Sequence, residues 1–129
     1  LACERRDEQD LQRLDAVMTR TQAVLAEGGN IVHEDTDFHI ALVDATHNSV
    51  LVRVLNAFYR FTARRRELLF NDHEHGQASA REHRRLIEHV RKREAEKAEA
   101  LILRHMDRAR NYWSFVLGAG EWRDTSSKR

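Results

Sequence analysis

Residues 33–51 read HEDTDFHIALVDATHNSVL and carry the clearest helical pattern of the chain. Its apolar residues recur three and four positions apart, the spacing that places side chains on one face of an α-helix: Phe38, Ala41, Leu42 and Ala45. Asp35 and His39 are also four apart, so they share a face at the edge of the apolar one. A carboxylate and an imidazole that point inward both need partners, and a metal ion would serve both.

The remainder of the chain is also typical of a helical protein. Its 129 residues include no proline and five glycines, and no segment alternates polar and apolar residues as a strand would. The pattern predicts helices over residues 7–27, 31–45, 49–70, 80–91 and 95–117, with a polar loop at residues 71–79. Short connections between long amphipathic helices predict antiparallel neighbours. We therefore expect an all-α antiparallel bundle of five to six helices.

Several residues predict where these helices begin and end. Gly28 should stop the first helix. Side chains that accept hydrogen bonds from free backbone N–H groups should cap the following three helices: Asn30, then Asn48 or Ser49, then Ser79.

The helix at residues 49–70 carries the longest apolar stripe, which we expect to face the core: Leu51, Val54, Leu55, Phe58, Phe61, Leu68 and Leu69. Arg65 falls in the middle of this stripe, with Thr62 beside it. A buried arginine needs an anion, and the carboxylate of a small effector would serve. The alternative is that Arg65 reaches the rim of the bundle or pairs with a nearby acid. Arg64 and Arg66 are expected to be solvated.

Two further histidines fit a metal site by geometry. Residue 94 lies midway between His83 and His105, and the break between the last two helices falls there. In an antiparallel hairpin, both histidines would lie at the same height, about 16 Å from the turn. With Asp35 and His39 they offer three imidazoles and a carboxylate, a set that suits zinc first, with nickel, manganese or iron as alternatives.

Plainer interpretations of the same residues stay open. Asp35 and His39 can form an ordinary hydrogen bond within a helix, and single inward histidines are often core residues with satisfied partners. His73 and His75, in the predicted loop, are a weaker second metal candidate.

Composition excludes several classes of protein. The 22 basic and 21 acidic residues nearly cancel, so this chain has no general basic field for binding nucleic acid. The single cysteine, Cys3, rules out an internal disulfide and suits a reducing cytoplasm. Apolar runs are too short to span a membrane. We read the chain as a piece of a longer protein, with one domain at residues 1–117 and a tail at residues 118–129.

Three segments resemble a known family. DTDFHIALVDATHN (residues 35–48) is similar to the D-x-x-F-H-x-x-L…A-x-x-N signature of the ligand-binding FCD domain of FadR-branch GntR-family bacterial transcription regulators. EHRRLIEHVRKREAEKAEALILRHM (residues 82–106) resembles the ending of that domain, and LACERRDEQDLQRLDAVM (residues 1–18) resembles its early part. The resemblance covers roughly residues 1–110.

The resemblance implies a fold, a partner and a ligand set. Such regulators have an N-terminal winged helix-turn-helix that binds operator DNA, followed by an all-α bundle that dimerises and holds a small organic acid. Many members bind a divalent metal through one Asp and three His, which here would be Asp35, His39, His83 and His105. From the same resemblance we expect this chain to lack the DNA-binding domain and the first helix of the bundle, which in relatives often supplies an effector-binding arginine. The turn usually written Gly-Asp is Arg93-Glu94 here, which should make a poorer helix stop.

We therefore expect the effector-sensing domain of a transcription regulator, and no enzyme. It would bind a divalent metal and a small carboxylate effector, form a homodimer, and modulate DNA binding by the absent domain. One alternative is a metalloenzyme, but Glu82 is the one nearby acid and should point away from His83. The other is a metal-free dimerisation module. Candidates for the dimer face include Tyr112, Trp113 and Phe115.

Overall fold

The computed structural model describes the backbone of residues 1–118 and the side chains of residues 1–111. The side chains of Tyr112, Trp113 and Phe115 lie outside the described residues, as do residues 119–129 of the predicted tail. Six helices follow one another: α1 (Ala2–Arg5), α2 (Glu8–Ala26), α3 (Val32–Asp44), α4 (Ser49–Phe70), α5 (His73–Arg91) and α6 (Ala95–Gly118). The described residues contain no strand, so the predicted all-α class is confirmed. None of these helices is long and apolar enough to cross a membrane.

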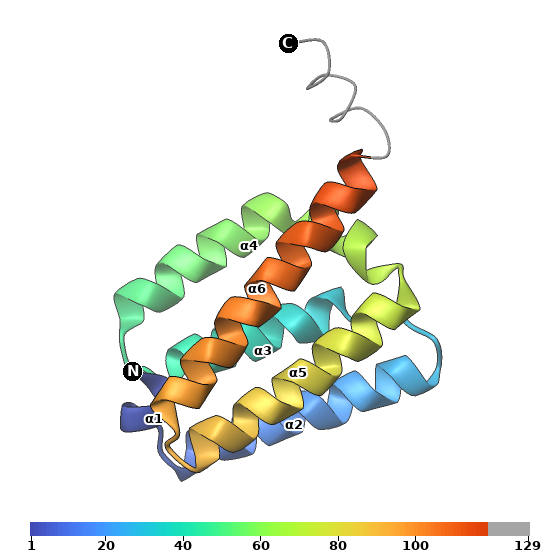
Figure 1. The fold of residues 1–129 in the computed structure, drawn as a ribbon. Helices are drawn as coiled ribbons and strands as arrows, with labels where there is room; N and C mark the ends of the chain where they lie inside the picture. Colours follow the sequence, from blue (N-terminus) through green and yellow to red (C-terminus); the bar gives the residue numbers. More distant parts are fainter. Residues whose placement is uncertain (119–129) are drawn as a thin grey trace.

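Neighbouring helices in the chain pack against each other, as short connections require. α2 contacts α3, α3 contacts α4 and α5 contacts α6, while α5 also closes back onto α2. In Figure 1, α2 and α4 lie at opposite edges of the bundle, with α3 between them. Leu14, Phe38 and Leu101 are almost completely buried where α2, α3 and α6 meet the core.

Local hydrogen bonds fix the ends of α2 and the start of α4. The Asp7 side chain accepts from the backbone N–H of Asp10 at 2.9 Å, and the Asp10 side chain accepts from the backbone N–H of Asp7 at 2.8 Å. These two hydrogen bonds form a capping box. Gly28 follows α2 with a φ of 73°, as expected for a glycine stop. Asn48 caps α4 by accepting from Val50 and Leu51. These predicted ends are confirmed.

The start of α3 differs slightly from the prediction. Ile31, and not Asn30, is the residue before the first helical one. The Asn30 side chain still accepts from the N–H of Val32 at 2.9 Å. Its amide donates to the Glu67 carbonyl and to Asn71 Oδ1, both at 2.8 Å, so Asn30 also ties the start of α3 to the end of α4.

The predicted loop at residues 71–79 is wrong, because most of it is the first part of α5. Asp72 caps this helix by accepting from Glu74 and His75, and Ser79 is buried inside it. The polar, glycine-containing sequence misled the prediction. At Gly76 a Cβ would lie 3.4 Å from the side chain of Leu25, so this part of α5 is in contact with the end of α2.

The predicted inward face of α4 is also wrong. Most of its apolar residues are exposed, with exposed fractions of 53% for Phe58, 62% for Val54 and 93% for Phe61. The half-buried face lies on the other side of the helix: Val52, Leu55, Asn56, Tyr59, Thr62, Arg66 and Leu69. α3 therefore meets a largely polar face of α4, and the more apolar face has no partner among the described residues.

The turn between α5 and α6 stops the helix without glycine. Arg93 adopts a φ of 58°, and its N–H donates to Val90 while that of Glu94 donates to His89, the pattern of a Schellman motif. The Arg93 guanidinium also donates to the carbonyls of Cys3 and Glu4, both at 2.9 Å. The turn therefore ends α5 as a Gly-Asp turn would. In addition, the Arg93 side chain attaches α1 to this end of the bundle.

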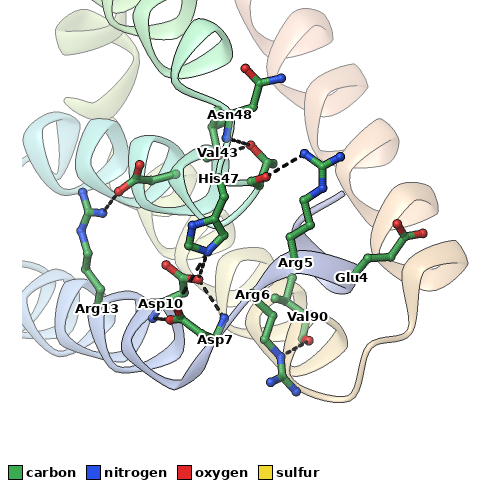
Figure 2. Close-up of polar contacts among 12 residues, drawn as sticks. Glu4, Arg5, Arg6, Asp7, Asp10, Arg13, Val43, His47, Asn48 and Val90 are labelled. Carbon is green, nitrogen blue, oxygen red and sulfur yellow. Dashed lines mark hydrogen bonds and ion pairs between the residues drawn. The ribbon is translucent and has the colours of Figure 1, made fainter.

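Arginines attach α1 to the end of the bundle. Figure 2 shows Arg5 and Arg6 reaching in different directions from this short helix. Arg5 donates to the Thr46 carbonyl at 3.1 Å, at the corner between α3 and α4. Arg6 donates to the Val90 carbonyl at 3.3 Å and to the Arg91 carbonyl at 2.6 Å, at the end of α5.

Candidate metal centre

Four side chains from three helices converge inside the bundle. Asp35 and His39 come from α3, His83 from α5 and His105 from α6, and all four are buried. One potential ligand atom of each lies within 4.8 Å of the others. Asp35 Oδ1 lies 3.4 Å from Nε2 of both His39 and His83. The structure thus brings together the four residues that the sequence selected.

Helix geometry explains why these four meet. Asp35 and His39 are one turn apart on α3 and so face the same way. His83 and His105 lie on the two arms of the α5–α6 hairpin, whose turn is at residues 92–94. Their ring centroids are 4.9 Å apart, as equal heights in an antiparallel pair predict.

Phe38 holds two of the histidine rings in place. Its ring is fully buried and stacks on the His83 ring, with centroids 3.9 Å apart and an angle of 6° between the planes. It also meets the His39 ring edge-on, at 5.2 Å and 81°. Contact with this buried ring limits rotation of both imidazoles. The positions of their nitrogen atoms are therefore fixed by apolar packing.

The charges of the cluster suit cation binding. Burial alone raises the pKa of Asp35, but the hydrogen bond with His39 and the charge of Arg66 outweigh it and bring the pKa far below its usual value. Burial lowers the pKa of His83 and of His105. The carboxylate is therefore ionised and these two imidazoles are neutral at pH 7, which are the protonation states that metal ligands need.

One atom in the cluster has an unsatisfied lone pair or proton. His83 Nε2 is buried and has no hydrogen-bond partner among the described residues. Such a group is costly unless something binds it. A metal bound by His83 Nε2 would remove this cost. The donor set, three imidazole nitrogens and one carboxylate, fits a divalent ion of the first transition row.

Glu82 fixes the orientation of His105, a role that the sequence did not reveal. Glu82 Oε1 accepts from His105 Nδ1 at 3.0 Å, which leaves Nε2 as the lone-pair nitrogen. Glu82, which the sequence analysis expected to point away from His83, reaches a different ligand, His105 on α6. Arg108 also donates to Glu82, from Nε at 2.8 Å. Burial raises the pKa of Glu82, while Arg108 and His105 lower it to below its usual value.

Arg66 occupies the position beside the cluster that we expected for Arg65. Arg65 is exposed, so its predicted burial is wrong. The side chain of Arg66 is only 12% exposed and forms an ion pair with Asp35 Oδ2. The reason is that the polar face of α4 turns inward, and Arg66 lies one residue further round the helix. Tyr59, two turns earlier, belongs to the same face.

The other predicted contacts do not join the cluster. Thr62 lies half-buried on the inner face of α4, and its hydroxyl donates to the Phe58 carbonyl one turn earlier. The effector roles of Thr62 and Arg65 stay predictions. His73 and His75 belong to no group of three or more potential ligands in the described part of the chain. His75 instead lies 3.1 Å from Arg108 Nη1.

A second group of potential ligands is explained by helix capping. Asp7, Asp10 and His47 lie close together at the start of α2, and Figure 2 shows the His47 ring pointing at Asp10. Asp10 Oδ2 accepts from the Asp7 N–H and lies 2.8 Å from His47 Nε2. These carboxylates already bind backbone and imidazole groups, so the first cluster is the stronger candidate.

Comparison with known proteins agrees with the geometry. A family model described as the FCD domain matches residues 1–108. The chain belongs to the FCD domain family. The predicted resemblance to the FCD domain of GntR-family regulators is thereby confirmed.

Relatives of this FCD domain include three bacterial regulators. The uncharacterized HTH-type transcriptional regulator YdhC of Bacillus subtilis is 27% identical over 94% of this chain and 55% of its own length. The HTH-type transcriptional regulator LutR of the same organism is 32% identical over 82% of the chain and 51% of its own length. The Uxu operon regulator of Haemophilus influenzae is 26% identical over 76% of the chain and 39% of its own length. The chain thus spans about half, or less, of these relatives.

Proposed function

We propose that residues 1–117 form the metal-dependent effector-sensing domain of a GntR-type transcription regulator. One observation carries the proposal: four buried metal-ligand side chains converge in a chain of the FCD family. The relatives are named as regulators, which supports a role outside catalysis.

The proposed ligands are Asp35, His39, His83 and His105. Zinc is the first candidate for the metal, with nickel, manganese and iron as alternatives, because the set mixes imidazole nitrogen with one carboxylate oxygen. Elemental analysis of protein purified without an affinity tag tests this part. Less than a stoichiometric amount of any divalent metal, even after incubation with each candidate ion, would contradict it.

The proposed effector is a small carboxylate. A divalent ion bound by four protein ligands supplies a positive centre with further coordination positions for a carboxylate oxygen. The buried surroundings strengthen this attraction, since charged contacts are stronger where water is excluded. A thermal-shift screen of organic acids, with and without added metal, tests this part. An acid that binds the folded state should raise the melting temperature only when metal is present.

The exposed apolar face of α4 supports a homodimer. Val54, Phe58 and Phe61 lie on one side of this helix and are more than half exposed in a single chain. A second copy of the chain would bury them by pairing the same face across a two-fold axis. α4 would then carry Arg66 beside the cluster on one face and the dimer contact on the other.

The proposed output is altered DNA binding by an N-terminal winged helix-turn-helix domain of the full-length protein. Effector binding would favour one arrangement of the dimer over another and so change the spacing of two DNA-binding domains. A coupling of about 1–3 kcal/mol would change operator affinity roughly 5–150-fold. Operator binding by the full-length protein, measured with and without an acid found in the screen, tests this step. Unchanged affinity would contradict it.

A further inference from the structure

Arg66 is a second cationic group at the edge of the metal centre. Its guanidinium pairs with Asp35 Oδ2, and Nη1 donates to Thr36 Oγ1 at 2.7 Å. The guanidinium carbon lies 4.0 Å from the centre of the Tyr59 ring, a cation–π contact. The Tyr59 ring in turn lies 5.9 Å from the His39 ring. Tyr59 therefore holds Arg66 next to the ligand cluster.

The two oxygens of Asp35 have different partners. Oδ1 faces His39 and His83 at 3.4 Å each, whereas Oδ2 faces Arg66. A metal that binds through Oδ1 can leave the contact between Oδ2 and Arg66 in place. The two hydrogen bonds of Arg66 within the described part of the chain use two of the five N–H donors of a guanidinium. The remaining donors suit a carboxylate.

The net charge of the side chains around the site, together with that of a divalent ion, indicates which ligand charge would be neutralised best. The charges of Asp35 and Arg66 cancel, those of Glu82 and Arg108 cancel, and an imidazole that binds a metal through its lone pair adds no charge. A divalent ion would therefore leave the centre with a net charge of about +2, which is costly in a buried site. A monocarboxylate would neutralise half of this charge. A dianion would neutralise all of it.

We infer that the effector is a dicarboxylate. One carboxylate would bind the metal, and the other would bind the Arg66 guanidinium, which lies over the Tyr59 ring. This inference rests on the proposed metal-dependent sensing function and adds a contact to it. Arg66 would select by charge, because its guanidinium matches the planar carboxylate and cannot lose its proton.

Malate and lactate test the inference, because malate is lactate with one additional carboxylate. The probe is the 129-residue chain loaded with zinc and titrated with each acid in a calorimeter. Malate should bind at least about tenfold more tightly than lactate, as expected for one added charged hydrogen bond. Arg66→Gln should reduce this preference to below about threefold, while zinc affinity measured against a chelator changes less than the malate affinity. Arg65→Gln, the exposed neighbour, should keep the full preference.

Each other result points to a particular failure. Equal binding of malate and lactate by the wild-type chain, or zinc binding without malate binding, overturns the inference alone. A preference for malate that is retained in Arg66→Gln, or lost in Arg65→Gln, overturns the assignment to Arg66.

The remaining outcomes concern metal binding and folding. Loss of zinc binding in Arg66→Gln would mean that Arg66 only holds the metal ligands in place. A wild-type chain that binds no divalent metal removes the proposed function as well. If Arg66→Gln does not fold, Arg66→Lys should lose most of the preference, since Lys lacks the planar paired donors.

Discussion

Glu82 and His105 are joined across the α5–α6 hairpin by a hydrogen bond of 3.0 Å from imidazole Nδ1 to carboxylate Oε1. The contact decides which nitrogen of His105 carries the proton, and therefore which one faces the other three ligands. Arg108 donates to the same carboxylate and keeps it ionised.

Glu82→Gln should weaken zinc binding about 10–100-fold without removing it, because such outer contacts orient a ligand but do not bind the metal. Competition with a chelator measures the change. Glu99→Gln, at an exposed position on α6, is the matched control and should bind zinc like the wild type. Equal zinc affinity of both variants would show that the Glu82 contact has no part in the site.

His83→Ala should abolish the stabilisation that zinc provides. In the wild-type chain, zinc at a concentration of about 100 times its dissociation constant should add about 2.7 kcal/mol to the free energy of unfolding. Removing one of four ligands should eliminate most of this gain, as measured by thermal unfolding with zinc and with EDTA. His33→Ala changes an exposed histidine of α3 and should keep the gain. A zinc-dependent gain in His83→Ala would contradict the assigned ligand set.

The metal-free protein should become less stable as the pH falls. Burial lowers the pKa of His75, His83 and His105 below the ordinary value of 6.5, so the unfolded chain takes up protons before the folded chain does. These neutral histidines contribute fully to the free energy of unfolding above about pH 6.5. The contribution is lost as the pH falls below this value, by up to about 1.4 kcal/mol per pH unit for a fully buried histidine such as His83. Urea unfolding in EDTA at several pH values between about 5.5 and 7.5 measures this. Stability that stays constant or rises toward acid pH would disprove the expectation.

Phe61→Glu should convert a dimer into a monomer while leaving the helical content unchanged. Phe61 is 93% exposed on α4, so a charge there costs nothing in the single chain but disrupts an apolar interface. Sedimentation velocity measures the oligomeric state. Met106→Glu, on α6 at 54% exposure, is the matched change on another helix. If the dimer dissociates in Met106→Glu but not in Phe61→Glu, the interface lies on α6 and the proposed α4 interface is wrong.

Phe38→Ala should destabilise the chain by about 3–5 kcal/mol, because it removes a fully buried ring and leaves a cavity beside His39 and His83. Urea unfolding in EDTA separates this effect from metal binding. Leu103→Ala, at an exposed position on α6, should change the stability by less than about 0.5 kcal/mol. Similar losses in the two variants would contradict the central place of Phe38 in the core.

Some wrong predictions share one cause. The stripe around Phe58 and Phe61 has the spacing of a core-facing surface, yet α3 packs against the opposite side of α4. That side carries Tyr59 and Arg66, and the Arg66 guanidinium lies over the Tyr59 ring and pairs with Asp35 of α3. Their spacing of seven residues was visible in the sequence, but nothing local showed that this face turns inward.

The start of α5 shows the same limit on a smaller scale. Both Asp72 and Ser79 can cap a helix, and the polar segment between them favoured the later start. The close approach of Gly76 to Leu25 on α2 belongs to the packed bundle, and residue preferences in a single segment do not record it.

Residue spacing and residue type along the chain were enough to predict the helical class, the stop at Gly28, the cap at Asn48 and the set of four potential ligands. These features depend on spacing within one helix or across one hairpin, and the chain geometry of a helix makes such distances predictable. Three features depend on long-range packing and could not be predicted: Glu82 orients His105, Arg66 pairs with Asp35, and the apolar face of α4 is exposed. Residue spacing predicts which side chains lie on the same face of a helix. Whether that face packs against another helix or is exposed depends on contacts between residues far apart in the sequence.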